Sequence, residues 1–199
     1  RGEMELSIQE NVQASTNSSK KAEAMHISCK ALILLVKMRG KQIQSLLELL
    51  VDKLCASAAF APVAVILHCE QILAGISALD AVRTVRCVTQ FVGNVGNGQV
   101  RIRLLALHAL SASMKNLTAP ELLSLLPQIS PAVVPLFDSS LVDVRKAVVF
   151  VLVEAYLVVG DALLPFVEDL VPAQKKLLTI YIERQMSQKK GTGTGGPSA

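Results

Sequence analysis

The chain has 199 residues, of which 51% are hydrophobic, 18% charged and only 4% aromatic, and its formal net charge is +4. So many apolar side chains require a sizeable buried core, which excludes a mostly disordered chain. The basic residues are scattered among acids, which indicates mild steering towards acidic partners and falls short of a nucleic-acid footprint. A core of Leu, Val, Ile and Ala without tryptophan favours stacked helices over a β-sandwich. We therefore predict an all-α fold.

Three segments differ in composition. Residues 1–20 are polar, and we expect a flexible linker or a loose leading helix there. Residues 21–188 carry the helical pattern and form the expected folded domain, while 189–199 are Gly-rich and predicted to be a disordered tail. The most hydrophobic run, 147–159, is too short to span a bilayer and is expected to be a buried helix, so no membrane insertion is predicted.

Apolar residues recur at three- and four-residue steps along most of the domain, which predicts a run of paired amphipathic helices. The first pair joins a helix from Lys21 to a partner over 42–56, with Gly40 between them. The expected buried faces are Ile27, Ala31, Leu34, Leu35 and Met38 on the first helix, and Ile43, Leu46, Leu47, Leu50, Val51 and Leu54 on its partner.

The second pair is expected over 62–75 and 79–92, with Ser77 and Asp80 at the start of its second helix. Residues 93–98 contain three glycines and form the clearest break in the chain. Because they follow a helix and not a strand, we interpret them as an inter-repeat loop and not as a phosphate-binding loop.

The third pair covers 100–116 and 120–137. Thr118 with Glu121 three residues later predicts a capping box at the start of the second of these helices. Three prolines inside that helix predict a bend, or a break near Ser130.

The fourth pair begins after Asp138, where Ser140 with Asp143 fits a helix N-cap. Its first helix is expected to end at Gly160 and to be followed by an apolar helix over 162–170. Pro172 then begins a last helix to about Gln188. The expected buried face of the first helix is Val144, Ala147, Val148, Val151, Leu152 and Ala155.

The helix openings are phased along the chain. Ile27, Val63, Val100 and Val144 fall in one column, separated by 36, 37 and 44 residues, which is in or near the range of HEAT-like repeats. Each unit must stack on the next to bury its second face, so we predict an α-solenoid of HEAT-like repeats.

Arginines in these repeats are expected to have structural roles. Arg101 and Arg145 follow the valine that opens their helices, and we expect Asp138 or Asp143 to be the partner of Arg145. Arg83 and Arg86 are interpreted as a solvated basic stripe.

Neither catalysis nor metal binding is predicted for this chain. The four cysteines lie in apolar helical segments and are interpreted as buried free thiols in a reducing compartment. His26 with Cys29, and His68 with Cys69, are isolated pairs without the spacing of a zinc site. The histidines lie on separate repeats, so we predict that the chain is not an enzyme and holds no metal or cofactor.

The last quarter of the chain resembles a known family. Residues 138–184 combine a DVRK step that opens an apolar helix, a glycine before a Leu-Pro-Phe helix, and a final helix with an Ile-Tyr pair at Ile180 and Tyr181. This order is similar to the end of the C-terminal TOG-like domain of CLASP, the cytoplasmic linker associated proteins that regulate microtubules. The segment LPQISPAVVPLF before it looks similar too.

The resemblance implies a non-catalytic module that docks other proteins, such as CLIP-type plus-end linkers, kinetochore proteins, or cortical and trafficking adaptors. It also implies self-association as a possibility, and a location in the cytoplasm on microtubules, the spindle, kinetochores or the cell cortex. TOG domains that grip tubulin use an aromatic residue in the first turn within a helix pair. Here that turn carries Lys37, Arg39 and Lys41 and no aromatic residue, so we expect weak or no direct tubulin binding.

Two surfaces are candidates for partner binding. The first is the basic turn with Lys37, Arg39 and Lys41, although solvated charges at a helix end would read the same way. The second is the last helix, which offers Lys175, Lys176, Tyr181 and Arg184. Capping of the solenoid is the favoured role of that helix, because a terminal repeat needs a polar outer cover. Two alternative functions stay open: a tubulin-binding TOG domain, and a general HEAT scaffold of a transport or phosphatase complex.

Overall fold

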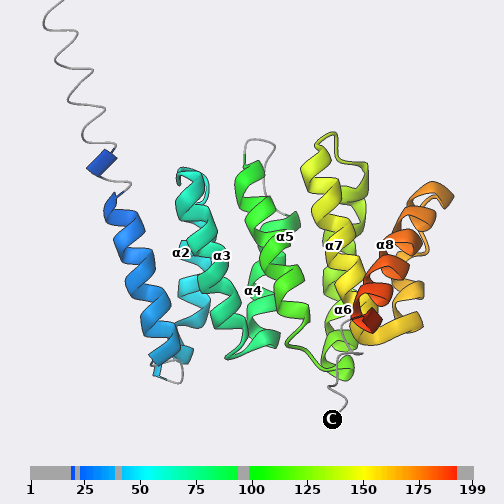
Figure 1. Cartoon of the computed structure of the whole chain (residues 1–199), viewed down its shortest axis with the longest axis horizontal. Coiled ribbons are helices and arrows are strands. Elements are labelled where there is room, and N and C mark those ends of the chain that lie inside the picture. The colour runs from blue at the N-terminus through cyan, green and yellow to red at the C-terminus, as the bar shows by residue number, and fades with distance from the viewer. Residues whose placement is uncertain (1–18, 21–22, 39–41, 94–98, 192–199) are drawn as a thin grey trace, which may run out of the picture.

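The computed structural model describes residues 19–20, 23–38, 42–93 and 99–191, with side chains described as far as Gln188. Every regular element in these residues is a helix, so the predicted all-α class is confirmed (Figure 1). The predicted linker before residue 19, the loop at 94–98 and the tail after 191 lie outside the described residues.

A first helix over 23–38 is followed by a regular series. The elements are η1 (Gln44–Leu46), α2 (Leu47–Ser57), α3 (Val63–Ser77), α4 (Ala81–Gly93), α5 (Val100–Met114), α6 (Ala119–Val133), η2 (Val134–Asp138), α7 (Val142–Val159), η3 (Gly160–Val167) and α8 (Pro172–Gly191).

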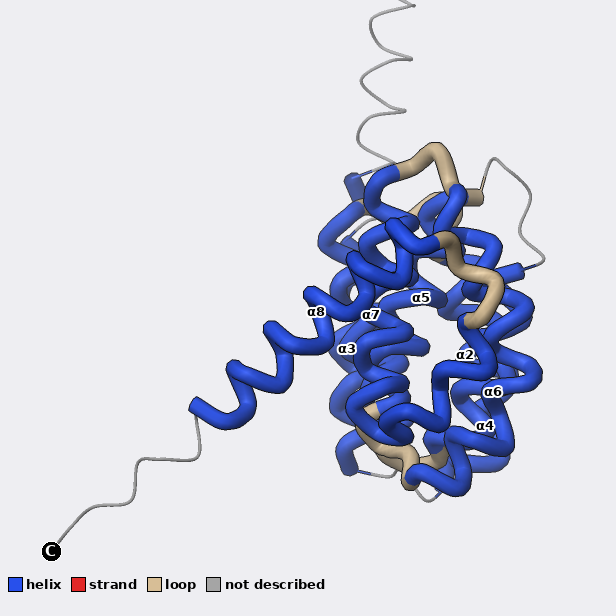
Figure 2. Tube along the Cα trace, turned by 90° about the vertical axis from the view of Figure 1, so that its right-hand side faces the viewer, coloured by secondary structure: helices blue, strands red, loops and turns tan. Residues whose placement is uncertain are grey.

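The helices form two layers. α3, α5 and α7 pack side by side in one layer, and α2, α4 and α6 in the other, with η3 continuing the second layer against α6 and α7 (Figure 2). Figure 1 shows the layers running from the N-terminal helix at one end to α8 at the other. This is the architecture of a HEAT-like α-solenoid, in which each unit buries its inner face against its neighbours.

Polar contacts between successive units repeat with the period of the solenoid. Arg101 Nη1 donates to the Ala61 carbonyl at 3.2 Å, Asn116 Nδ2 to Ser77 Oγ at 3.2 Å, and Lys115 Nζ lies 3.3 Å from Glu154 Oε1. The sequence separations of the first two contacts are 40 and 39 residues. These contacts therefore connect equivalent places in neighbouring units.

The arginines have structural roles, but their partners differ from the predicted ones. Arg145 Nη1 donates to the Ser139 carbonyl at 2.6 Å and not to Asp138 or Asp143. Arg83 bonds to the Gln44 carbonyl at 3.1 Å and is paired with Glu48, so it is more than a solvated charge. A guanidinium has five donors, which suits it to carbonyls left unpaired at helix ends.

The predicted buried face of the first helix is wrong. Ile27 is 60% exposed and Met38 77% exposed, while the buried residue is Val36, at 4%. Its half-buried residues, such as Cys29 and Ile33, face the core instead. This helix is apolar on most of its circumference, so its period alone does not choose a face. For the partner helix the prediction is confirmed at Ile43, Leu47, Val51 and Leu54. Leu50 is only partly buried, and Leu46, in η1, is exposed.

The second pair differs from the prediction at its turn. α3 does not end at Gly75 but continues to Ser77, and a Cβ at Gly75 would lie 3.1 Å from Val36 Cγ1. The glycine thus permits close approach of the first helix. Asp80 caps the start of α4, because its Oδ1 accepts a hydrogen bond from the Arg83 backbone N–H at 3.0 Å. Ser77, predicted at the same place, is instead the last residue of α3.

The prolines of α6 do not break it near Ser130. The α-helix continues through Pro127 and Pro131 to Val133 and then tightens into η2, where Pro135 lies. Each proline removes one N–H from the hydrogen-bond ladder, and the change to a 3-10 helix comes at Val134, after Pro131 and just before Pro135.

The N-cap predicted at Ser140 is wrong, because α7 has Leu141 at its N-cap position without a side-chain cap. The buried face predicted for α7 is confirmed at all six positions. Gly160 ends the helix as predicted, with φ of 62°. The apolar segment that follows is the 3-10 helix η3 and not an α-helix.

By length and composition alone, the continuous helical stretch 142–167 could cross a membrane, with a mean hydropathy of 2.2 over its most apolar window. Buried core helices pass the same test, and α7 packs against α5 and α8. Its Glu154 is paired with Lys115 of the neighbouring unit. We therefore interpret α7 as a core helix.

The capping box at the start of α6 is confirmed. The Thr118 backbone N–H donates to Glu121 Oε2 at 2.8 Å, and the Thr118 hydroxyl donates to the same oxygen at 2.7 Å. These two hydrogen bonds hold the pKa of the Glu121 carboxyl below its usual range.

Replacing Thr118 with alanine is expected to lower the free energy of unfolding by about 1 kcal/mol at pH 7. The contribution of Glu121 is present above its unfolded-state pKa and is lost as the pH falls through its lowered folded-state pKa. Urea unfolding at pH 7 measures the loss in Thr118→Ala. The same measurement on wild type and Glu121→Gln at pH 7 and pH 3 tests the Glu121 contribution, and an equal gap between these two proteins at both pH values would contradict it.

Candidate docking groove between α7 and α8

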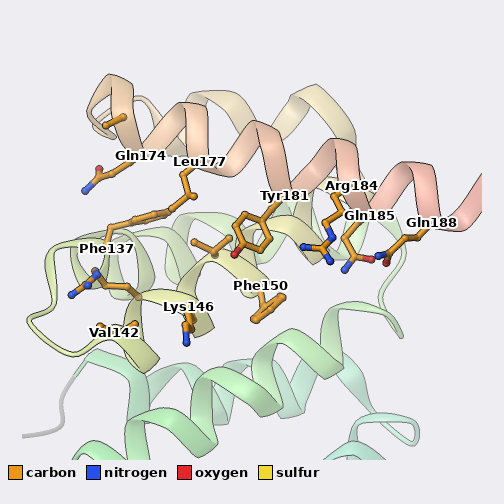
Figure 3. Close-up of a pocket in the computed structure, with 13 residues that line it drawn as sticks. Phe137, Val142, Lys146, Phe150, Gln174, Leu177, Tyr181, Arg184, Gln185 and Gln188 are labelled. Atoms are coloured by element: carbon orange, nitrogen blue, oxygen red, sulfur yellow. The ribbon is translucent and has the colours of Figure 1, made fainter.

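An apolar groove of about 690 Å³ lies between α7 and α8. Its apolar lining comes from Val142, Val149 and Phe150 of α7, from Leu177 and Tyr181 of α8, and from Phe137 before α7. Figure 3 shows Leu177 and Tyr181 pointing from α8 towards the α7 side. Large apolar side chains that converge on a concave surface are typical of a binding site.

Two aromatic rings mark the middle of the groove. The Phe150 and Tyr181 rings meet edge to face, with centroids 6.1 Å apart and an interplanar angle of 85°. Phe150 is still 45% exposed and Leu177 42% exposed, so the two helices do not cover each other's apolar residues. Exposed aromatic and leucine side chains grouped on one surface indicate an interaction site.

The groove exists because α8 leaves the body of the solenoid. Leu178 and Ile182 of α8 are buried against the core, and Gln174 Nε2 donates to Asp138 Oδ1 at 2.8 Å near the start of the helix. Beyond these contacts the helix points away from the two layers (Figure 2). Leu177 and Tyr181, on the neighbouring stripe of α8, therefore remain accessible.

All charged residues that line the groove are basic. They are Arg145, Lys146 and Arg184, and no Asp or Glu is among the described lining residues. Arg145 is held by the Ser139 carbonyl, and Lys146 Nζ lies 3.9 Å from Asp143 Oδ1 at the rim. The groove therefore combines an apolar floor with positive charge.

Two of the residues predicted for partner binding, Tyr181 and Arg184, lie in this groove. Lys175 does not, since its Nζ donates to the Glu168 carbonyl at 2.8 Å, and Lys176 is exposed elsewhere on α8. Lys37 lies exposed at the other end of the solenoid. The remaining two, Arg39 and Lys41, fall outside the described residues.

The α7 side of the groove was missed by sequence reasoning. Phe150 and Lys146 lie opposite the correctly predicted buried face of α7. The signal was present, because a phenylalanine on the outer face of a helix with a complete buried stripe is exposed by default.

The structure brings together residues that the sequence separates. The His26 and His68 rings lie 4.5 Å apart in a T-shaped contact, and the Cys29 and Cys69 thiols are within hydrogen-bonding contact. Among the described residues, no group of three His, Cys, Asp or Glu is arranged to hold a metal ion.

The cysteines differ in accessibility, which predicts different reactivity. Cys55 and Cys69 are buried, and burial raises their pKa to about 12 and about 11, while Cys29 and Cys87 are half-buried. Because the thiolate is the reactive form, iodoacetamide at pH 8 is expected to modify Cys29 and Cys87 first in the native protein. Peptide mass spectrometry over a time course measures this, and early modification of Cys55 would contradict it.

Comparison with known proteins gives matches over about half of the chain. A "CLIP-associated protein" of Arabidopsis thaliana is 34% identical over 106 residues, which is 53% of this chain and 7% of that protein. "CLIP-associating protein 1-B" of Xenopus laevis is 28% identical over 109 residues, or 55% of this chain and 8% of that protein. The resemblance to the CLASP family is confirmed.

The matched region thus spans less than a tenth of the length of these CLASP relatives. No family model matches it. Among solved structures, a TOG domain of C. elegans Zyg9 has a TM-score of 0.31 and 16% identity, covering 80% of this chain and 75% of that one.

Proposed function

We propose that this chain is a non-catalytic, protein-docking domain of a microtubule-associated CLASP-like protein. The observation that carries the proposal is the apolar groove between α7 and α8, in a chain similar to proteins named for association with CLIP. The aromatic residues Phe150 and Tyr181 are anchors of the kind that dominate protein–protein binding.

The proposed partner is a CLIP-type plus-end linker, with kinetochore or cortical adaptors as further partners of the same groove. Such docking would place the protein in the cytoplasm on microtubules and their attachment sites. Direct tubulin binding is proposed to be weak or absent, because no aromatic residue stands in the turn after the first helix. Co-elution with unpolymerised tubulin on size exclusion would contradict this part of the proposal.

The test is direct binding of the purified chain to a purified CLIP-type linker, by isothermal titration calorimetry. The double variant Phe150→Ala/Tyr181→Ala is expected to bind at least ten-fold more weakly, since truncation of a buried aromatic anchor typically costs 2 kcal/mol or more. Phe150 is exposed and Tyr181 is partly buried at the edge of the core, and circular dichroism checks that the variant folds.

Ile180→Ala is the matched control. Ile180 is 50% exposed on the same helix but does not line the groove, so its replacement is expected to leave binding unchanged. The proposal is overturned if the intact chain binds neither the linker nor other adaptors, or if the control and the double variant lose binding equally.

A further inference from the structure

The groove is bounded by two helices, and each presents one stripe of residues to it. On α8 its lining residues recur at Ala173, Leu177, Tyr181 and Arg184, and on α7 at Val142, Lys146 and Val149. These steps of three and four residues make one stripe on each helix, and both stripes face the same space. Two such stripes together form the seat that an amphipathic helix uses in helix-in-groove recognition.

The length of the groove fits one short helix. Lining residues on α8 extend from Ala173 to Gln188, which corresponds to about 22 Å along an α-helix at 1.5 Å per residue. A helix of about four turns, on the order of 15 residues, therefore matches the groove from end to end.

The charge of the groove selects among possible helices. In the described part of the chain, Arg145, Lys146 and Arg184 are the charged residues that line it, and the one acidic residue paired with them, Asp143, lies at the rim with its Oδ1 3.9 Å from Lys146 Nζ. A helix with Asp or Glu beside its apolar stripe is therefore attracted from both α7 and α8. A basic helix would meet the same three cations and be repelled. The chain's own residues 189–199 are excluded as occupant, since they contain two lysines, no acid and no large apolar residue.

We propose that the groove between α7 and α8 binds an acidic amphipathic helix of a partner protein, with its apolar stripe on Phe150, Leu177 and Tyr181 and its carboxylates near Lys146 and Arg184. This inference rests on the proposed docking function and adds the chemistry of the partner segment.

Three synthetic peptides of 18 residues test it, each labelled for fluorescence anisotropy with the intact chain. The first has leucine or phenylalanine at i, i+4, i+7 and i+11 flanked by glutamates, the second replaces each glutamate by lysine, and the third scrambles the first. The acidic amphipathic peptide is expected to bind at least ten-fold more tightly than either of the other two, and to weaken as salt is raised.

Charge reversal locates the site. Lys146→Glu/Arg184→Glu is expected to weaken the acidic peptide at least ten-fold and to strengthen the lysine peptide. Both side chains are exposed, so the fold should be kept. Lys176→Glu is the control, because Lys176 is exposed on α8 outside the groove, and it is expected to change binding less than two-fold.

Each other result overturns the inference. Equal binding of acidic and lysine peptides would exclude charge selection, and binding of the scrambled peptide would exclude an amphipathic helix. Concentration-dependent self-association, seen by analytical ultracentrifugation and abolished by Lys146→Glu/Arg184→Glu, would make a second copy the occupant. If the CLIP-type linker binds through Phe150 and Tyr181 while the acidic peptide does not, the inference fails and the proposed function stands.

Discussion

Replacing Leu110 with alanine is expected to lower the free energy of unfolding by about 3 kcal/mol, within a range of about 2 to 5 kcal/mol. Leu110 is fully buried in α5, the middle helix of its layer, between α3 and α7. Removing its side chain loses apolar burial and leaves a cavity that neighbouring helices cannot fully close. Urea unfolding followed by circular dichroism measures the loss.

Leu123→Ala is the control for this variant. Leu123 lies in α6 and is 36% exposed, so the same change of side chain there is expected to cost less than half as much. A loss below about 1 kcal/mol for Leu110→Ala would mean that the solenoid does not pack around α5 as described.

Replacing Gly160 with alanine is expected to lower the free energy of unfolding by about 1 to 3 kcal/mol. Gly160 has φ of 62° and ψ of −141°, a conformation that side chains with a Cβ rarely adopt. A Cβ there would meet nothing within 4 Å, so the cost comes from backbone strain and not from a clash. The strain would act at the junction of α7 with η3.

Gly93→Ala separates this effect from the general effect of removing a glycine. Gly93 ends α4 at ordinary φ, and its new Cβ would lie 3.7 Å from Ala132 Cβ, a normal contact. This variant is expected to be neutral or more stable by about 0.5 kcal/mol, because the unfolded chain loses freedom. If both variants destabilise equally, the special backbone at Gly160 is not the cause.

The sequence predicted α7 better than the first helix for a physical reason. The buried stripe of α7 could be read because residues such as Asp143, Lys146 and Glu154 interrupt the apolar pattern around it. Residues 31–38 are almost continuously apolar, so any face could be buried. Which face of the first helix is buried depends on its packing against α3, where Gly75 leaves room for the Val36 side chain.

Local chemistry predicted some helix ends but not how the backbone continues beyond them. Thr118 with Glu121 and the glycine at 160 marked a beginning and an end correctly. Whether the next segment is an α-helix or a 3-10 helix depends on packing against α6 and α7, as in η3. Neighbours of this kind cannot be read from a local pattern.

Part of the α8 wall of the candidate groove could be predicted, and the α7 wall could not. Tyr181 and Arg184 were identified from the pattern of the last helix alone. Phe150 and Lys146 were not, because a groove depends on the direction in which α8 leaves α7. That direction follows from the burial of Leu178 and Ile182 and from the Gln174 contact with Asp138.

The central claim, that partners dock between α7 and α8, is tested most directly by hydrogen–deuterium exchange of the chain with and without a bound CLIP-type linker. Docking in the groove predicts slower exchange on binding in peptides covering 142–151 and 173–188, with peptides of α3 unchanged. Slower exchange confined to the first helix, α2 and α3, with α8 unaffected, would contradict it and move the docking surface to the other end of the solenoid.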